Sequence, residues 1–87
     1  DKKIALVTGA NRGIGLETAR QLARLNIHVL LGSRNAEKGN AAAKELKSEG
    51  LDVESIQLDV DDALTHRAAF EYIKKTFGKL DILINNA

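Results

Sequence analysis

The 87-residue sequence contains no cysteine and no tryptophan, and aromatic residues make up only 3% of it. The absence of cysteine excludes a disulfide framework and a cysteine-based zinc site. With two Phe and one Tyr, any core must be built from aliphatic side chains. No apolar run approaches the ~20 residues that cross a bilayer, and no secretory signal peptide is present. We therefore expect a cytoplasmic protein without a membrane partner.

An excess of charge of either sign is also missing, because 13 basic and 12 acidic residues give a formal net charge of +1. A nucleic-acid-binding surface needs a basic excess, so we expect no nucleic-acid partner. Apolar residues make up 44% of the chain, which is enough for a core. The length allows at most one small domain, and we expect residues 1–87 to form it.

Apolar, β-prone runs alternate with amphipathic stretches along the chain. The predicted strands are Ile4–Val7, Ile27–Leu31, Val53–Leu58 and Leu80–Ile84. The predicted helices are about Ile14–Leu25, Ala36–Ser48, and a third that Asp61 or Asp62 caps and Gly78 ends. This β-α-β-α-β-α-β order predicts an α/β fold with a parallel sheet. Right-handed crossovers favour a doubly wound sheet of strand order 3-2-1-4.

Spacings of three and four residues predict which helix faces turn inward. The predicted inward residues are Ile14, Thr18, Leu22 and Leu25 in the first helix, Ala36, Ala43 and Leu46 in the second, and Ala63, Phe70, Ile73 and Phe77 in the third. Asn26 is the predicted cap at the end of the first helix.

The first strand leads into a glycine-rich turn, which spans Thr8 to Gly15, and then into a helix. This arrangement brings backbone N–H groups and the positive end of a helix dipole to one point, which suits a pyrophosphate. We expect Gly9 to turn the chain off the strand and Gly13 to let phosphates approach the backbone. Gly15 is expected to let helix and strand pack closely.

Four segments carry a resemblance to a known family. They are the T-G-x-x-x-G-x-G turn at residues 8–15, Gly32-Ser33-Arg34-Asn35, Leu58-Asp59-Val60, and Asn85-Asn86-Ala87. In this order and at these separations they resemble the short-chain dehydrogenase/reductase family over the whole chain, and its carbonyl-reductase-like members in particular. The resemblance implies a truncated half of a Rossmann-type fold, so that residues 1–87 form a single partial dinucleotide-binding domain.

The resemblance also implies an activity for the parent enzyme, which would move a hydride between NADPH and a carbonyl or alcohol substrate. The Ser, Tyr, Lys and Asn that the family uses for this reaction come after the Asn-Asn-Ala motif. They are absent from these 87 residues, which we therefore expect to bind the cofactor and not to catalyse.

The residues after the second strand indicate which dinucleotide is bound. NAD-binding folds often place an acidic residue at this point, where it bonds the ribose hydroxyls. This chain has Gly32, followed by Ser33 and Arg34. A hydroxyl at Ser33 and the guanidinium groups of Arg34 and Arg12 suit a 2′-phosphate, so the sequence favours NADP(H) over NAD(H). The alternative for Arg34 is an ordinary solvated loop arginine.

Further roles are implied by the resemblance alone. Asp59 would accept a hydrogen bond from the adenine amino group beside Val60, although a helix N-cap is an alternative for it. Asn85 would steady neighbouring strands, and Asn86 and Ala87 would line the ribose near the nicotinamide. The complete predicted cofactor site is Gly9, Asn11, Arg12, Gly13, Ile14, Gly15, Ser33, Arg34, Asn35, Asp59, Val60, Asn86 and Ala87.

Other polar residues carry less chemistry. His28 and His66 lack metal-ligand spacing, so no metal site is predicted; we expect one at a strand start and the other on a wet helix face. Tyr72 is not followed by a lysine at the family's Tyr-x-x-x-Lys spacing, so it receives no catalytic role. The charged residues at 44–49 are expected to form a solvated helix face.

Two other functions remain open. One is a stand-alone nucleotide-binding or scaffold module, and the other is a sugar-nucleotide epimerase, whose usual G-x-x-G-x-x-G spacing differs from the one here. In the predicted strand order, the last strand forms an open edge with apolar residues on both faces. We therefore expect the chain to self-associate through that edge.

Overall fold

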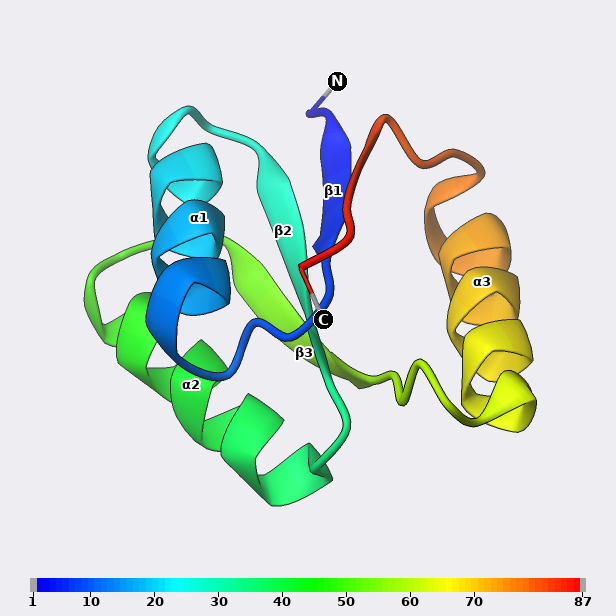
Figure 1. Cartoon of the computed structure of the whole chain (residues 1–87). Helices are drawn as coiled ribbons and strands as arrows, with labels where there is room; N and C mark the ends of the chain where they lie inside the picture. Colours follow the sequence, from blue (N-terminus) through cyan, green and yellow to red (C-terminus); the bar gives the residue numbers. More distant parts are fainter. Residues whose placement is uncertain (1, 87) are drawn as a thin grey trace.

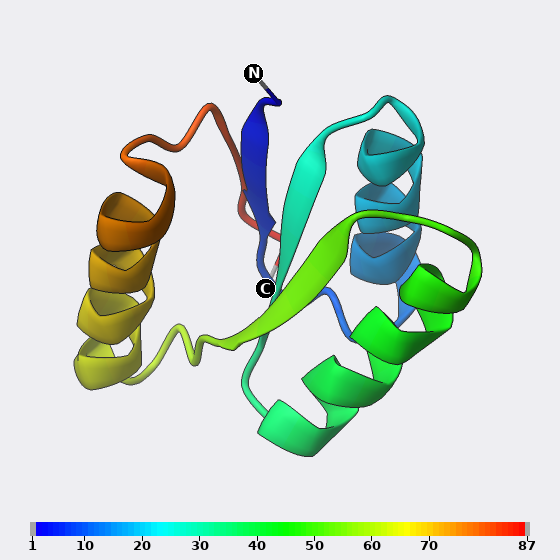
Figure 2. The ribbon, with the colours of Figure 1, turned by 180° about the vertical axis from the view of Figure 1, so that it is seen from behind.

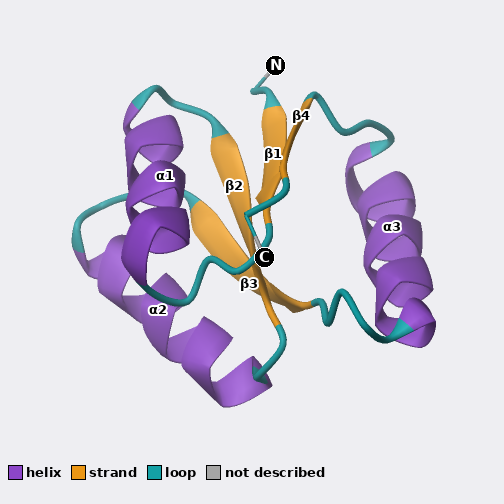
Figure 3. Ribbon diagram, in the orientation of Figure 1, coloured by secondary structure: helices purple, strands orange, loops and turns teal. Residues whose placement is uncertain are grey.

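Four strands form one parallel sheet in the order β3-β2-β1-β4, as predicted (Figure 3). The computed structural model describes residues 2–86. Helices α1 and α2 cover one face of the sheet and α3 covers the other, so the sheet is doubly wound (Figures 1 and 2). The elements are β1 (Ile4–Val7), α1 (Gly13–Arg24), β2 (His28–Ser33), α2 (Ala36–Ser48), β3 (Val53–Gln57), α3 (Ala63–Phe77) and β4 (Ile82–Ile84).

Alternate side chains of the central strands β1 and β2 point to opposite faces, and each face has its own apolar cluster. Val7 and Leu31 belong to the cluster beneath α1 and α2. Leu6 and Leu30 belong to the cluster beneath α3, to which Ile73 contributes. Burial on two faces explains why these strands read as continuous apolar runs in the sequence.

Strand β2 is longer than predicted. It reaches Ser33 because Gly32 and Ser33 pair with Ile56 and Gln57 of β3. The third strand correspondingly ends at Gln57, one residue before the predicted end. The carboxyl ends of β2 and β3 therefore lie at the same edge of the sheet as the glycine turn.

Strand β4 is shorter than predicted, because Asp81 takes another role. The Ile4 N–H group donates to the Asp81 carboxylate at 2.7 Å, and the Asp81 N–H donates to the Ile4 carbonyl at 2.9 Å. The hydrogen bond from Ile4 is the main cause, followed by Lys79, of a pKa of Asp81 below its ordinary value. This residue fastens the start of β4 to the start of β1.

The predicted inward face of α1 is wrong at its two ends, whereas Leu22 is half-buried against the cluster beneath α1 and α2, as predicted. Gly15, Ala19 and Ala23 face the sheet, whereas Ile14 and Leu25 are 79% and 71% exposed. The backbone at Gly15 lies against that of Gly9, so the helix runs too close to the sheet for larger side chains to fit beneath it. The helix ends with Leu25 as its cap, and the predicted cap Asn26 follows with a left-handed φ of 64°.

The inward faces of α2 and α3 are partly as predicted. Ala43 and Leu46 of α2 are buried together with Gly39 and Ala42, while Ala36 is exposed. In α3 the buried residues are Ile73, as predicted, and Ala69, which was not predicted; Phe77 is half-buried, and Ala63 and Phe70 are exposed. Within the described residues α3 is the one helix on its face of the sheet (Figure 2), and its Phe70 side chain is 40% exposed.

His28 begins β2, as expected, but His66 does not lie on a wet surface. It is half-buried, and its Nε2 atom is buried without a hydrogen-bond partner in the part of the chain that the structure describes. None of the helices within residues 2–86 has the length and apolarity to cross a membrane.

Candidate functional site

The turn that follows β1 has a backbone conformation that favours glycine. Gly9 and Gly13 both have a φ of +60°, a region that other residues enter at a cost. The Thr8 N–H group still donates to Ile84 of β4 at 2.9 Å, and the Ala10 N–H donates to Gly32 of β2 at 3.0 Å. The turn is therefore anchored to both neighbouring strands before α1 begins.

The N-terminus of α1 is open. Arg12 occupies the N-cap position, but its side chain makes no capping hydrogen bond. A Cβ added to Gly13 would meet no atom within 4 Å, so space is available directly beside the backbone. Free N–H groups at the positive end of a helix dipole form a site for an anion.

Thr8 joins the turn to the segment that follows β4. Its hydroxyl oxygen accepts a hydrogen bond from the Asn86 N–H at 2.8 Å and lies within hydrogen-bond distance of two acceptors, Asn85 Oδ1 at 3.2 Å and the Ile84 carbonyl at 3.4 Å. Asn86 Nδ2 also donates to the Gly9 carbonyl at 3.3 Å. This linking role of Thr8 is not among the sequence predictions. The signal for it is a hydroxyl residue that directly follows an apolar strand.

A cleft of about 490 Å³ opens at the carboxyl ends of the strands. Eight of its lining residues were predicted, and Leu58 and Asp61 were not. The lining consists of Gly9, Asn11, Arg12, Gly13, Arg34, Leu58, Asp59, Val60, Asp61 and Asn86. The segments that follow all four strands thus meet at this cleft, because the carboxyl ends of parallel strands lie at one edge of a sheet.

Two cations stand at this cleft. The side chains of Arg12 and Arg34 are exposed, and neither forms an ion pair with another residue in the range 2–86. Both guanidinium groups are thus free to bind an anionic ligand. A cavity of about 520 Å³ between β3 and α3 has no Lys or Arg in its lining and offers no comparable charge for a phosphate.

Asp59 does not cap α3. Asp62 is the N-cap and accepts a hydrogen bond from the Leu64 N–H at 3.0 Å. One carboxylate oxygen of Asp59 accepts from the Asp61 N–H at 2.9 Å, while Thr65 holds the Asp59 backbone. Asp59 is thereby fixed at the cleft wall with its second carboxylate oxygen available to a ligand.

Four of the remaining predicted site residues, Ile14, Gly15, Ser33 and Asn35, do not line the cleft. Ser33 is 1% exposed and its hydroxyl donates to the Asn35 carbonyl at 2.8 Å. Asn35 Oδ1 in turn accepts from the Lys38 N–H as the N-cap of α2. Ile14 points outward and Gly15 lies buried behind the turn. Ala87 lies outside the described residues.

No group of three or more His, Asp or Glu side chains within residues 2–86 could hold a metal ion. Tyr72 lies on α3, where its hydroxyl donates to Glu54 of β3, away from the cleft. That hydrogen bond is also the main cause of a raised pKa of Tyr72. The cleft itself can therefore bind a ligand with phosphate groups through backbone N–H groups and arginines, and its lining within residues 2–86 contains no Ser, Thr, Tyr, His or Lys.

Known sequences agree with this geometry. A model described as short chain dehydrogenase matches residues 3–87. Carbonyl reductase (NADPH) 3 from Homo sapiens is 46% identical over 86 residues, which are 98% of this chain and 31% of that protein. Short-chain dehydrogenase/reductase 1 from Saponaria officinalis is 47% identical over 89 residues, 99% of this chain and 30% of that protein.

Solved structures give the same result. Menthone neomenthol reductase from Mentha piperita superimposes with a TM-score of 0.95 at 47% identity, covering 99% of this chain and 31% of the other. Salutaridine reductase from Papaver somniferum gives a TM-score of 0.95 at 44% identity, covering 99% and 30%. The chain spans about a third of the length of each of these relatives.

Proposed function

This chain belongs to the short-chain dehydrogenase/reductase family, and from that premise we propose that the cleft at its glycine turn binds NADP(H). The observation that carries the proposal is the position of Arg12 and Arg34 beside an open helix N-terminus. Backbone N–H groups suit the pyrophosphate, and two unpaired guanidinium groups suit an additional phosphate. A dinucleotide with a 2′-phosphate has both features.

The residues present fit such a ligand. The open space at Gly13 gives the pyrophosphate access to the start of α1. Arg34, directly after β2, would hold the 2′-phosphate, with Arg12 as a second cation, since both side chains line the cleft. Ser33 supports this loop from below and does not contact the phosphate, since its buried hydroxyl is directed to Asn35.

The far wall of the cleft would hold the adenine. Leu58 and the exposed Val60 offer apolar contact, and the second carboxylate oxygen of Asp59 is an acceptor for the adenine amino group. At the other end, Asn86 is fixed by Thr8 and Gly9 and is placed to contact the nicotinamide ribose. The bound nicotinamide would supply a hydride.

We propose that a longer protein carrying this segment is an NADP(H)-dependent oxidoreductase acting on a carbonyl or alcohol. The names of carbonyl reductase (NADPH) 3 and of the related reductases support this proposal. In such a protein, these residues would bind and orient the cofactor, and proton transfer would fall to groups from the rest of the chain.

Isothermal titration calorimetry of the chain with NADP, NAD, 2′,5′-ADP and 5′-AMP tests the proposal. We expect NADP to bind more tightly than NAD, and 2′,5′-ADP more tightly than 5′-AMP by a similar factor. The adenosine fragments isolate the 2′-phosphate contribution from that of the nicotinamide. Equal affinities within both pairs would refute a 2′-phosphate site, and no binding in any titration would refute the nucleotide site altogether.

A further inference from the structure

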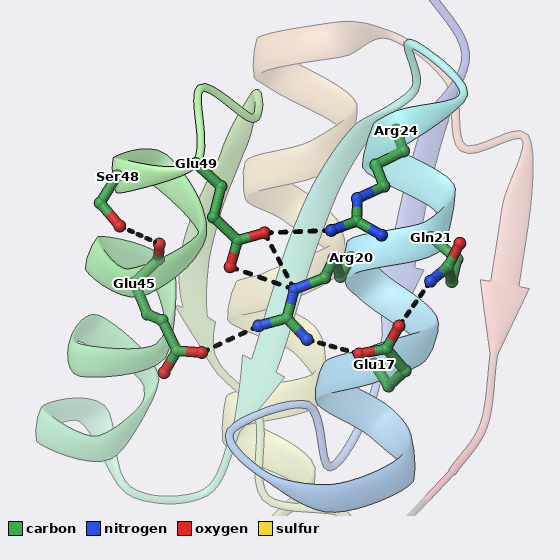
Figure 4. Close-up of polar contacts among 7 residues, drawn as sticks. All are labelled: Glu17, Arg20, Gln21, Arg24, Glu45, Ser48 and Glu49. Atoms are coloured by element: carbon green, nitrogen blue, oxygen red, sulfur yellow. Dashed lines mark hydrogen bonds and ion pairs between the residues drawn. The ribbon is translucent and has the colours of Figure 1, made fainter.

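Arg20 lies between α1 and α2 and bonds three carboxylates at once (Figure 4). Its Nη2 donates to Glu45 of α2 at 2.8 Å, and its Nε donates to Glu49, the C-cap of α2, at 3.0 Å. Its Nη1 bonds Glu17 on its own helix. The Arg20 side chain is only 17% exposed. The predicted solvated face of α2 therefore supplies carboxylate partners for a half-buried guanidinium group.

Few other groups join these helices. Within residues 2–86, the only further side-chain bond between them is a longer ion pair of 3.6 Å from Arg24 to Glu49. Helix α1 rests on β1 and β2, and α2 rests on β2 and β3. The position of one helix relative to the other is therefore fixed through the sheet and through Arg20.

The sheet alone fixes these helices weakly against sliding. The fully buried residues of the two helices are glycine or alanine at six of seven positions, namely Gly15, Ala19, Ala23, Gly39, Ala42 and Ala43, with Leu46 as the exception. Such smooth faces pack closely but carry few large side chains that would interlock with the strands. Half-buried Leu16 and Leu22 of α1 also pack against the apolar cluster beneath these helices. The planar guanidinium group of Arg20, bonded to three carboxylates, restrains the two helices against sliding past each other.

Each of the two helices begins at a different part of the proposed nucleotide site. Helix α1 begins at Gly13, beside the proposed pyrophosphate position, and α2 begins directly after Arg34 and its cap Asn35. At 1.5 Å per residue, Arg20 lies about 10 Å along α1 from Gly13. A shift between the helices at Arg20 therefore changes the separation of the two phosphate positions.

We propose that Arg20 is a positioning residue, which sets the separation between the pyrophosphate position at Gly13 and the 2′-phosphate position at Arg34. The inference rests on the proposed function. NADP must satisfy both positions at once, whereas NAD places a phosphate only at the first. Loosening the Arg20 bonds therefore weakens NADP binding more than NAD binding.

The test measures dissociation constants for NADP and NAD by calorimetry in the unaltered chain and in Arg20→Gln, Arg20→Lys and Glu45→Gln. In Arg20→Gln we expect the preference for NADP over NAD to fall by about three- to tenfold. Arg20→Lys should recover part of it, since an ammonium keeps the charge without the fork. Glu45→Gln removes an exposed partner on α2 only, so that it tests the link even if Arg20→Gln fails to fold. Lys44→Gln, at an exposed lysine of α2 that forms no ion pair within residues 2–86, is the matched charge control and should leave the preference unchanged.

A second measurement separates positioning from general destabilisation. In an Arg34→Ala background the second phosphate position is gone, so Arg20→Gln should no longer change the ratio of the two dissociation constants. Equal weakening of NADP and NAD by Arg20→Gln, or an unchanged ratio in folded Glu45→Gln, would overturn the positioning role alone. Failure of the unaltered chain to bind either dinucleotide would overturn the proposed function and this inference with it.

Discussion

Gly15 at the first turn of α1 lies directly against the backbone of Gly9 in the turn that follows β1. A Cβ built on Gly15 would stand 2.9 Å from the carbonyl carbon of Gly9 and closer still to its oxygen, and 2.6 Å from Nδ2 of Asn86. The end of β1, the start of α1 and the segment after β4 therefore meet at one point. This contact brings the helix N-terminus to the edge of the sheet.

Gly15→Ala should destabilise the fold, because the methyl group would collide with backbone that cannot move independently. Overpacking of this kind costs about 1–3 kcal/mol, and we expect the upper part of that range, measured as a lower midpoint of urea unfolding. Gly50→Ala is the control, because a Cβ there meets no atom within 4 Å and the change carries only backbone strain. A Gly15→Ala chain as stable as the unaltered one would disprove the close contact.

Gly13→Ala should harm binding more than folding. Gly13 and Gly50 both have left-handed backbone and open space around the missing Cβ, so alanine at either position should cost a similar ~1–2 kcal/mol of stability. Of these two glycines, Gly13 lines the cleft and Gly50 does not. We expect Gly13→Ala to weaken NADP binding by about tenfold or more, or about 1.4 kcal/mol, and Gly50→Ala to leave it unchanged. Similar affinities of the two variants would show that the turn is purely structural.

The β4 edge should mediate self-association, with a second copy of the chain as the partner. One edge of β4 pairs with β1, and no other strand within residues 2–86 pairs with its second edge. Leu83 is 53% exposed at this position, and a bare apolar edge is a template for pairing. Sedimentation at micromolar concentrations should give the mass of two chains. Leu83→Lys should restore a monomer, whereas Leu64→Lys, at another exposed leucine on α3, should not. A monomeric unaltered chain would contradict this prediction.

Asp81 should make stability depend on acid pH. Its pKa is lowered in the folded chain, mainly by the hydrogen bond from Ile4 and then by Lys79. A lowered folded-state pKa stabilises the fold fully above the unfolded value of ~3.9, and that contribution is lost as the pH falls through the folded pKa. Asp81→Asn should therefore lower the thermal midpoint at pH 7, and its difference from the unaltered chain should shrink below about pH 4. The exposed Glu71→Gln is the control, and a pH-independent difference for Asp81→Asn would contradict the assignment.

The strand order and the limits of α2 could be predicted from the sequence because they depend on local signals. Alternating apolar runs fix the parallel sheet, and α2 has a clear N-cap at Asn35 and a stop at Gly50. The turn after β1 could also be predicted from its glycines, since Gly9 and Gly13 have the left-handed backbone that only glycine adopts readily. The family resemblance then supplied the cleft residues that neither spacing nor composition could identify.

Features that depend on three-dimensional packing were missed. The prediction places Ile14 and Leu25 inward on size and spacing, but the close contact at Gly15 makes small residues, Gly15, Ala19 and Ala23, the fully buried positions of α1. Asp81 was read as part of a strand, because its bond to Ile4 joins residues 77 positions apart. Ser33 was expected to reach a phosphate, yet β2 continues through it and buries its hydroxyl. Pairing partners distant in the chain decide each case.

The most direct test of the account is the affinity of the chain for NADP and NAD before and after Arg34→Ala. A charge-assisted hydrogen bond contributes about 1.5–3 kcal/mol, so the variant should bind NADP roughly ten- to a hundredfold more weakly while its NAD affinity stays nearly unchanged. Arg67→Ala, at an exposed arginine on α3 outside the cleft, should change neither. Equal affinities for NADP and NAD in the unaltered chain, with no effect of Arg34→Ala, would contradict the proposed 2′-phosphate site.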